Sequence, residues 1–203
     1  MKDKRYFFVG IIEDSKDTIG VIKRMFSIFD YDLCYQNTRG NIRILNKKNL
    51  EIFLISIKPE EVELFIDLGL ELDFLIINLK NLDQQGEKFL NKQFRKCNYY
   101  IINSDEDLDL LSLDQLDGIV ITYGFNSKAT MTISSHIIEQ TMEASLCLQR
   151  EITSLSAEKI GAFEFKVQMD SGDKDHIYSI LAASILGLPL EEENEDENVI
   201  KIH

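Results

Sequence analysis

The sequence predicts an α/β fold, with a mostly parallel sheet flanked by helices in three layers, a C-terminal antiparallel portion and a closing helix. Short, almost unbroken apolar runs alternate with amphipathic segments up to Tyr123, a layout typical of parallel strands joined by crossover helices. After Tyr123, strand-like runs are separated by polar turns instead, which indicates antiparallel pairing. The last long apolar segment has helical periodicity.

The chain opens with a strand and a helix. Tyr6–Ile12 is a nearly continuous apolar run, which suits a strand buried on both faces of a parallel sheet. Apolar residues then recur at helical spacing across Ile19–Phe29, with Lys23 and Arg24 on the opposite side. We therefore expect a strand, a polar turn and a helix in this order.

The same alternation continues and predicts about five parallel strands. The further strands expected are Glu51–Ile57, Phe74–Asn78, Tyr99–Asn103 and Gly118–Tyr123, and the intervening helices are Pro59–Leu68 and Gln85–Phe94. Strands joined by helices in this way run parallel, because each crossover returns the chain to the same end of the sheet.

The C-terminal part predicts three antiparallel strands and a helix. The strands are Met131–Ile138, Ala144–Gln149 and Phe163–Met169, and the helix is Asp173–Leu186, with Gly187 placed to end it. The acidic run Glu191–Glu197 is interpreted as a solvated tail, with docking to a basic partner as the alternative. Val199–His203 either adds a short edge strand or stays frayed. We expect residues 1–190 to form one domain and residues 191–203 a tail.

Composition narrows the class of protein. The 203 residues suit one domain, and 44% hydrophobic with 28% charged residues is typical of globular rather than disordered chains. A net charge of −13 disfavours nucleic acid and anionic membranes as partners, because like charges repel. No apolar run is long enough for a signal segment or a membrane span. We expect a soluble protein with a basic partner or a small ligand.

The cysteines and histidines give no sign of a cross-linked or metal-bound fold. They are few, far apart and without metal-ligand spacing: Cys34, Cys97, Cys147, His136, His176 and His203. Neither a disulfide framework nor a zinc site is indicated. We interpret the cysteines as reduced and mostly buried thiols, which is typical of a cytoplasmic protein, and we expect no metal site.

Several later segments resemble a known enzyme family. They are Ile101–Glu106, Ile121–Asn126, Ala129–Thr132, Cys147–Arg150 and Asp175–Ala183, the last running on to Leu186-Gly-Leu-Pro-Leu190. Their sequence and order resemble the central, ATP-binding domain of the Mur ligases, which add amino acids to peptidoglycan precursors, and of their polyglutamate-forming relatives. The resemblance covers most of the chain and implies a P-loop or Rossmann-like three-layer fold.

The phosphate-binding loop of that family is not preserved. In the family the first strand leads into G-T-x-G-K-T/S, whose backbone N–H groups and lysine hold phosphates. Here Glu13 and Lys16 stand in place of the glycines and Asp17 in place of the lysine, and only Thr18 remains. A slip of one residue makes Lys16 the phosphate lysine, but Asp17 then takes the hydroxyl position and no glycine returns.

Carboxylates facing a triphosphate repel it, so the resemblance predicts very weak ATP binding. An alternative reading of this turn needs no ligand. Asp14, Ser15 and Asp17 are good helix-capping residues, and acidic groups suit the positive end of a helix.

The other nucleotide-binding positions of the family are changed as well. Asn78 stands where the family carries a magnesium-binding glutamate, and an amide oxygen is a poorer magnesium ligand. Asp175, His176 and Ser179 stand where the closing helix carries one histidine and two asparagines. His176 is expected to face solvent. The histidine-containing region after the second strand is compressed to Asn81–Gly86, and the carbamylated lysine of many members has no counterpart.

We therefore expect a non-catalytic, Mur-ligase-like binding or regulatory module that needs no cofactor, linked to cell-envelope or polyglutamate metabolism. The UDP-substrate and C-terminal domains of the family are expected to be absent. The alternative is the nucleotide-binding subunit of a split ATP-dependent amino-acid ligase, which uses ATP and Mg²⁺ and has a protein partner. There, Asp105–Asp107 are candidate metal ligands, although a solvated turn is the simpler interpretation. A self-associating structural subunit is the third expectation.

Overall fold

A computed structural model of the chain describes residues 4–13, 17–61, 69–79, 96–105, 116–138, 141–169, 174–190 and 199–202. The strands are β1 Arg5–Glu13, β2 Asp32–Gln36, β3 Ile42–Lys47, β4 Leu50–Ile57, β5 Leu72–Asn78, β6 Lys96–Asn103, β7 Asp117–Tyr123, β8 Met131–Ile138, β9 Met142–Leu148, β10 Ile152–Thr153, β11 Lys159–Ile160, β12 Phe163–Met169 and β13 Val199–Ile202. The helices are α1 Thr18–Ile28, the 3₁₀ turn η1 Pro59–Glu61 and α4 Lys174–Leu190. Within these ranges eleven strands form one sheet, in the order β13-β12-β9-β8-β7-β6-β5-β1-β4-β3-β2, and β10 pairs with β11 separately.

The centre of the sheet is parallel, as predicted. β4, β1, β5, β6 and β7 lie side by side and all run in the same direction. Val9 of β1 pairs with Leu54 on one side and with Phe74 on the other, and all three side chains are fully buried. Each such side chain contributes about 1.5–3 kcal/mol on burial, so the unbroken apolar runs that predicted these strands also form the core.

A hairpin that the sequence analysis did not assign extends the sheet beyond β4. β2 and β3 pair antiparallel, and β3 pairs antiparallel with β4. The turn between β2 and β3 is held by Asn37. Its Nδ2 donates to Asn41 Oδ1 at 2.7 Å, and its Oδ1 accepts the Ile42 N–H at 3.1 Å. Gly40 has φ +72°, a left-handed conformation that favours glycine. This asparagine and glycine content was the available turn signal.

The C-terminal strands pair antiparallel, as predicted, and continue the same sheet. β8, β9 and β12 pair in this order, and the junction with the parallel part is the pairing of Tyr123 with Met131. β13 lies parallel to β12, so the segment from Val199 forms an edge strand instead of fraying.

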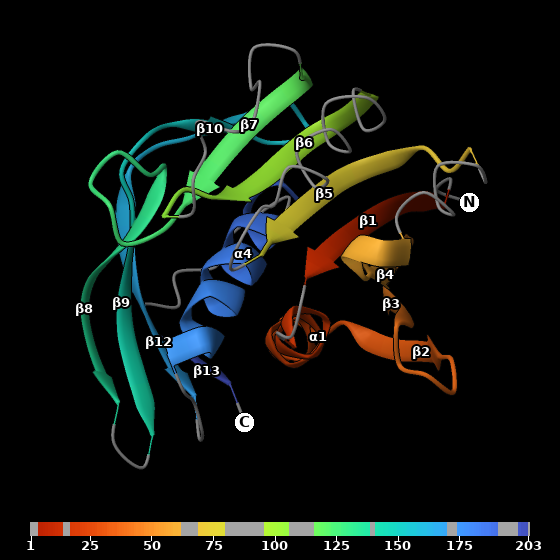
Figure 1. Cartoon of the computed structure of the whole chain (residues 1–203), viewed down its shortest axis with the longest axis horizontal. Coiled ribbons are helices and arrows are strands. Elements are labelled where there is room, and N and C mark those ends of the chain that lie inside the picture. Colours follow the sequence, from red (N-terminus) through yellow and green to blue (C-terminus); the bar gives the residue numbers. More distant parts are fainter. Residues whose placement is uncertain are drawn as a thin grey trace.

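Two helices pack on the same face of the sheet. Apolar side chains of α1 and α4 join those of β1, β5, β6, β8, β9 and β12 in one cluster, and Figure 1 shows α4 lying between the parallel strands and the β8-β9-β12 portion. α4 does not end at Gly187 as predicted. It continues to Leu190, because Leu188 and Leu190 are buried and their burial stabilises the last turn despite Pro189.

The opposite face carries a second buried cluster, which includes Ile12, Ile57, Leu75 and Ile77. Of the helix predicted at Pro59–Leu68 the structure describes η1 alone, and the helix predicted at Gln85–Phe94 lies outside the described residues. The second helical layer therefore stays a prediction. No helix in the described part of the chain is long and apolar enough to cross a membrane.

Candidate functional site

The carboxyl ends of three parallel strands bring polar residues to one place. Glu13 ends β1, Asn78 ends β5, and Ser56 is the next-to-last residue of β4. Glu13 and Asn78 are register partners, and all three side chains belong to the face that packs against α1 and α4. In open α/β sheets this edge is where ligands bind, next to the N-terminus of the first helix.

Glu13 occupies the end of the helix with its own carboxylate. Its Oε2 accepts the backbone N–H of Thr18, the first residue of α1, at 2.9 Å, and its Oε1 accepts from the Ser56 hydroxyl at 3.1 Å. The residue is only 6% exposed. Burial raises the pKa of the Glu13 carboxyl, the hydrogen bonds from Thr18 and Ser56 lower it in part, and the nearby charge of Asp17 adds to the rise.

Three other predicted site residues form a buried hydrogen-bonded cluster beside Glu13. Asn78 Nδ2 donates to Thr18 Oγ1 at 2.8 Å and lies 3.4 Å from Ser179 Oγ. The Thr18 and Ser179 hydroxyls are 3.0 Å apart, and all three residues are at most 1% exposed. The sequence analysis placed these residues in one ligand site, and the structure brings them together, bonded to one another.

Asp17 caps α1, as the alternative reading of the turn predicted. Its Oδ1 accepts the backbone N–H of Gly20 at 3.0 Å, and its Oδ2 lies 3.7 Å from Arg24 Nη1. A side-chain acceptor at this position satisfies one of the free N–H groups at a helix start and favours the positive end of the helix dipole. Together, Glu13 and Asp17 place two carboxylates of the chain itself at the N-terminus of α1.

The other predicted site residues lie outside the described residues or in the first turn of α4. Lys16, with Asp14 and Ser15, lies outside the described residues. Asp175 and His176 lie in the first turn of α4, and His176 is half-buried, so the expectation that it faces solvent is only partly met.

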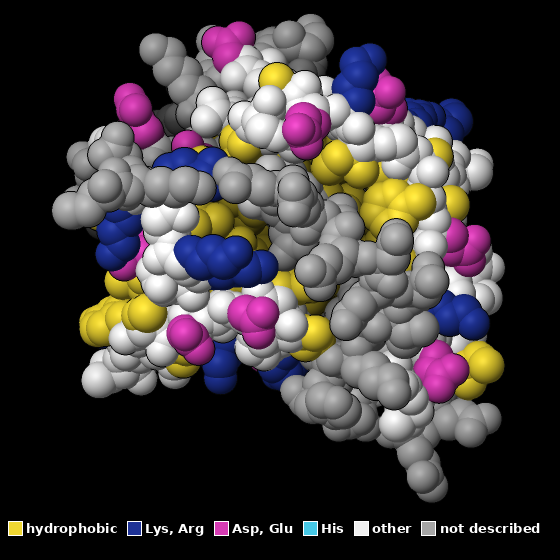
Figure 2. All heavy atoms as spheres, turned by 180° about the vertical axis from the view of Figure 1, so that it is seen from behind, with side chains coloured by type: hydrophobic (Ala, Val, Ile, Leu, Met, Phe, Trp, Pro, Cys, Tyr) yellow, Lys and Arg dark blue, Asp and Glu magenta, His cyan; other side chains and the backbone are white. Residues whose placement is uncertain are grey.

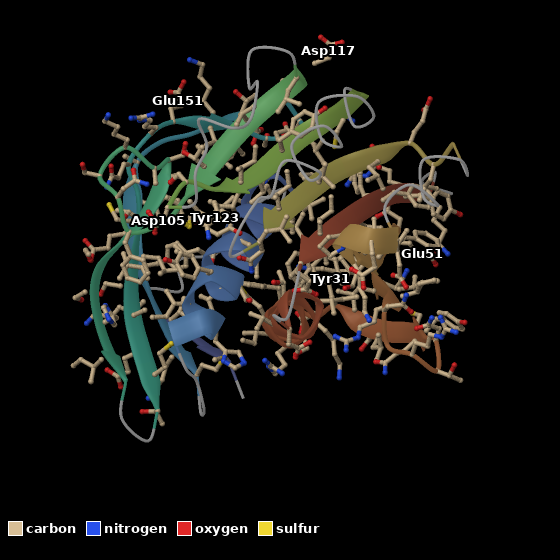
Figure 3. The ribbon with its side chains drawn as sticks, viewed as in Figure 1. Tyr31, Glu51, Asp105, Asp117, Tyr123 and Glu151 are labelled. Atoms are coloured by element: carbon tan, nitrogen blue, oxygen red, sulfur yellow. The ribbon has the colours of Figure 1, made fainter. Side chains whose placement is uncertain are left out.

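A second polar cluster was not predicted as a structural unit. Asp105, just after β6, accepts the N–H of Phe125 at 2.6 Å and of Asn126 at 3.1 Å, the Asn126 side-chain amide at 2.9 Å and the Tyr178 hydroxyl at 3.2 Å. Figure 3 shows Asp105 next to Tyr123, at the neighbouring ends of β6 and β7. This carboxylate therefore ties the turn after β7 to α4.

These contacts bear on the metal site that the alternative function requires. Asp105 is exposed in the turn after β6, as the simpler interpretation expected, and its carboxylate also accepts hydrogen bonds from four donors; Glu106 and Asp107 lie outside the described residues. Within the described ranges no group of three or more His, Cys, Asp or Glu residues is arranged to hold a metal ion.

The cysteines are free thiols in three environments. Cys97 is buried and Cys147 is half-buried, while Cys34 is exposed on β2. Burial raises the pKa of Cys97 to about 12, so this thiol stays protonated at neutral pH and is a poor nucleophile. The prediction of mostly buried thiols holds for Cys97 and in part for Cys147, but not for Cys34.

Comparison with known proteins identifies the fold. No protein-family model and no curated protein sequence matches the chain. Among solved structures it is similar to MurF from Acinetobacter baumannii, with a TM-score of 0.57 and 8% identity over 91% of this chain and 43% of that one. It is also similar to the UDP-N-acetylmuramate-alanine ligase MurC from Thermotoga maritima, with a TM-score of 0.56 and 14% identity over 92% of this chain and 42% of that one. The chain thus spans less than half of each enzyme. Its fold is that of a Mur ligase central domain.

Proposed function

We propose that this chain is a non-catalytic, Mur-ligase-like domain that serves as a binding or regulatory module. The observation that carries the proposal is the hydrogen bond from the Thr18 N–H to the buried carboxylate of Glu13. A helix N-terminus binds a phosphate through such N–H groups and through the helix dipole. In this chain a carboxylate already takes that position.

The neighbouring groups also fit MgATP poorly. Binding a triphosphate there requires that Glu13 be displaced or that two anions approach each other in a buried setting, and like charges brought together cost several kcal/mol. The Thr18 hydroxyl, the group that would approach magnesium, is bonded to Asn78 and Ser179. We infer that no nucleotide or metal cofactor is used.

The binding role is inferred from what the fold retains. The sheet, α1 and α4 share one hydrophobic core. The domain therefore keeps a defined shape, and its surface can bind a partner although the phosphate-binding groups of the family are changed. The structural neighbours include a ligase named for UDP-N-acetylmuramate and alanine, which suggests a role near peptidoglycan synthesis or polyglutamate formation in the cytoplasm. A protein partner, or a second copy of the chain, is the ligand that we expect.

Thermal unfolding with and without millimolar MgATP tests the proposal. We expect no change in Tm, because a ligand that does not bind the native state cannot stabilise it. A dose-dependent rise with MgATP, absent with Mg²⁺ alone, would overturn it, since a ligand at 100 times its Kd stabilises by about 2.7 kcal/mol. UDP-linked peptidoglycan precursors are tested in parallel, because a shift with these alone would identify a small ligand of a module without ATP chemistry.

A single-turnover assay of ATP consumption tests the split-ligase alternative. If the chain is the nucleotide-binding half of a ligase, the co-purified complex should consume ATP in a single turnover even where the chain alone does not bind it. Glu13→Gln is the informative variant, because it removes the negative charge and retains an acceptor for the Thr18 N–H. If this variant binds MgATP and the unchanged chain does not, the carboxylate is the element that excludes the nucleotide.

A further inference from the structure

The β2–β3 hairpin forms an end of the sheet with an open edge. β2 is the last strand in the order and pairs with β3 alone among the described strands. All five of its residues are exposed, including Leu33 at 39% and Tyr35 at 51%. An edge strand presents backbone N–H and C=O groups that can pair with another extended segment.

The hairpin and β4 are basic within an acidic protein. Residues 31–58 carry five basic side chains, namely Arg39, Arg43, Lys47, Lys48 and Lys58, against the two acidic residues Asp32 and Glu51, whereas the whole chain has a net charge of −13. Glu51 is paired with Lys4. Several Lys and Arg side chains are visible on this end of the molecule, at the left of Figure 2.

The two faces of the hairpin differ in chemistry. Arg43 and Lys47 pair in register with Leu54 and Leu50, whose side chains lie in the core cluster with α1, so both basic residues belong to that face. Lys47 lies over the Tyr31 ring on the same face. The Nε and Nη1 atoms of Arg43 are buried and meet no hydrogen-bond partner in the described part of the chain. Two basic side chains, Arg43 and Lys47, therefore belong to this face.

The opposite face is apolar around Tyr35, although Asp32 and Glu51 also belong to it. Tyr35 pairs with Ile44, and Ile44 pairs with Phe53, which stacks on Phe8 with ring centroids 4.8 Å apart. Because side chains alternate between faces along a strand, a segment added to β2 would direct every second side chain to the basic face and the others to the apolar face.

We propose that β2 binds an extended partner segment in which acidic and apolar residues alternate. Its acidic side chains lie on the face of Arg43 and Lys47, and its apolar side chains lie beside Tyr35, on the face to which Ile44 also belongs. Charge favours this occupant over a second β2, because pairing two copies edge to edge would bring two basic hairpins together.

The proposal rests on the proposed binding role, but its test does not involve nucleotide, so a negative result here leaves the MgATP experiment unaffected. The probe is a fluorescein-labelled octapeptide of alternating Glu and Val, titrated against the full chain and followed by anisotropy. The matched probe alternates Lys and Val. We expect micromolar binding of the Glu peptide, weakened at least tenfold between 50 and 500 mM salt, and no binding of the Lys peptide.

Two variants locate the site. Tyr35→Glu should weaken binding at least tenfold, because it replaces an apolar contact with a like charge at an exposed position. Ile137→Glu makes the same kind of change at a residue of β8 that is 59% exposed, and should leave binding unchanged. Hydrogen exchange should show new protection at β2 amides when the peptide binds.

Three results would overturn the proposal: equal binding of both peptides, equal loss in both variants, or protection confined to other strands. Sedimentation of the chain without peptide distinguishes self-pairing. A concentration-dependent dimer that Tyr35→Glu dissociates would show that the edge is occupied by a second copy instead.

Discussion

The Glu13 carboxylate and the Thr18 backbone N–H are joined at 2.9 Å, so the end of β1 is bonded directly to the first residue of α1. Glu13 also holds β4 through Ser56, and Thr18 holds β5 and α4 through Asn78 and Ser179. The edge of the sheet that binds ligands in related folds is therefore an internal junction of five elements, β1, α1, β4, β5 and α4. Substitutions here should act on stability, with a dependence on pH that identifies Glu13.

Glu13→Gln should become increasingly stabilising as pH rises. Burial raises the folded-state pKa of Glu13, so its favourable contribution is fully present below the unfolded-state pKa and is lost as pH rises through the folded-state value. Glutamine carries no charge, can accept the Thr18 N–H and can donate to Ser56. Urea unfolding of both proteins from pH 4.5 to 8 should show the difference in unfolding free energy moving in favour of the variant.

Glu143→Gln is the control for removing one negative charge, because Glu143 is exposed on β9. It should not reproduce the pH-dependent gain. A constant difference between Glu13→Gln and the unchanged chain across this range would show that Glu13 does not titrate as its buried position requires.

Thr18→Val should destabilise the protein by about 1–3 kcal/mol. Valine keeps the shape of threonine but removes the acceptor of Asn78 Nδ2 and the hydroxyl that contacts Ser179 Oγ, inside a fully buried site. The measurement is the urea midpoint at constant m value. If Thr18→Val is neutral, the cluster contributes no net stability and its hydroxyls are free to serve a ligand.

Asp17→Ala should lower stability by about 1 kcal/mol, because it removes the cap of the Gly20 N–H and the contact with Arg24. Asp17→Asn keeps an oxygen that can accept the same N–H and should recover most of the loss. Thermal unfolding of the two variants separates the cap from the charge. A loss of the same size in both would assign the effect to the charge.

Asp105→Ala should cost about 2 kcal/mol and loosen the turn after β7. It deletes the acceptor for the backbone N–H groups of Phe125 and Asn126, for the Asn126 side-chain amide and for the Tyr178 hydroxyl. Tyr178→Phe removes one of these bonds at 3.2 Å and should cost less than 1 kcal/mol. Hydrogen exchange at Phe125 and Asn126 checks the mechanism, because protection there should fall in Asp105→Ala and persist in Tyr178→Phe.

The parallel strands were predictable because each contains an apolar run, which in β5 is buried on both faces over Phe74–Asn78. β2 and β3 were not, because their residues are mostly exposed or half-buried and form no such run. The extension of α4 past Gly187 depends on the burial of Leu188 and Leu190, which is a tertiary effect that overrides a local stop signal.

The resemblance identified Thr18, Asn78 and Ser179 as nucleotide-binding positions of the family, and the structure shows their side chains hydrogen-bonded to one another. Their bonding was not predictable. That Glu13 turns inward to accept the Thr18 N–H follows from the packing of β1 against β4 and α1, which a single sequence does not contain. The role of Asp105 was missed because its partners lie about 20 and 73 positions away in the chain.

Gly118 gives a prediction about the junction of β6 and β7. A Cβ atom at this position would collide with the carbonyl oxygen of Cys97 and lie 2.9 Å from the Tyr100 ring, so the two strands could not keep their spacing. Gly118→Ala should therefore destabilise the protein by about 3 kcal/mol. Gly161→Ala is the control, because a Cβ there meets no atom within 4 Å, and it should leave stability unchanged or raise it by up to about 1 kcal/mol. Equal unfolding midpoints for the two variants would mean that β6 and β7 approach less closely than the structure has them.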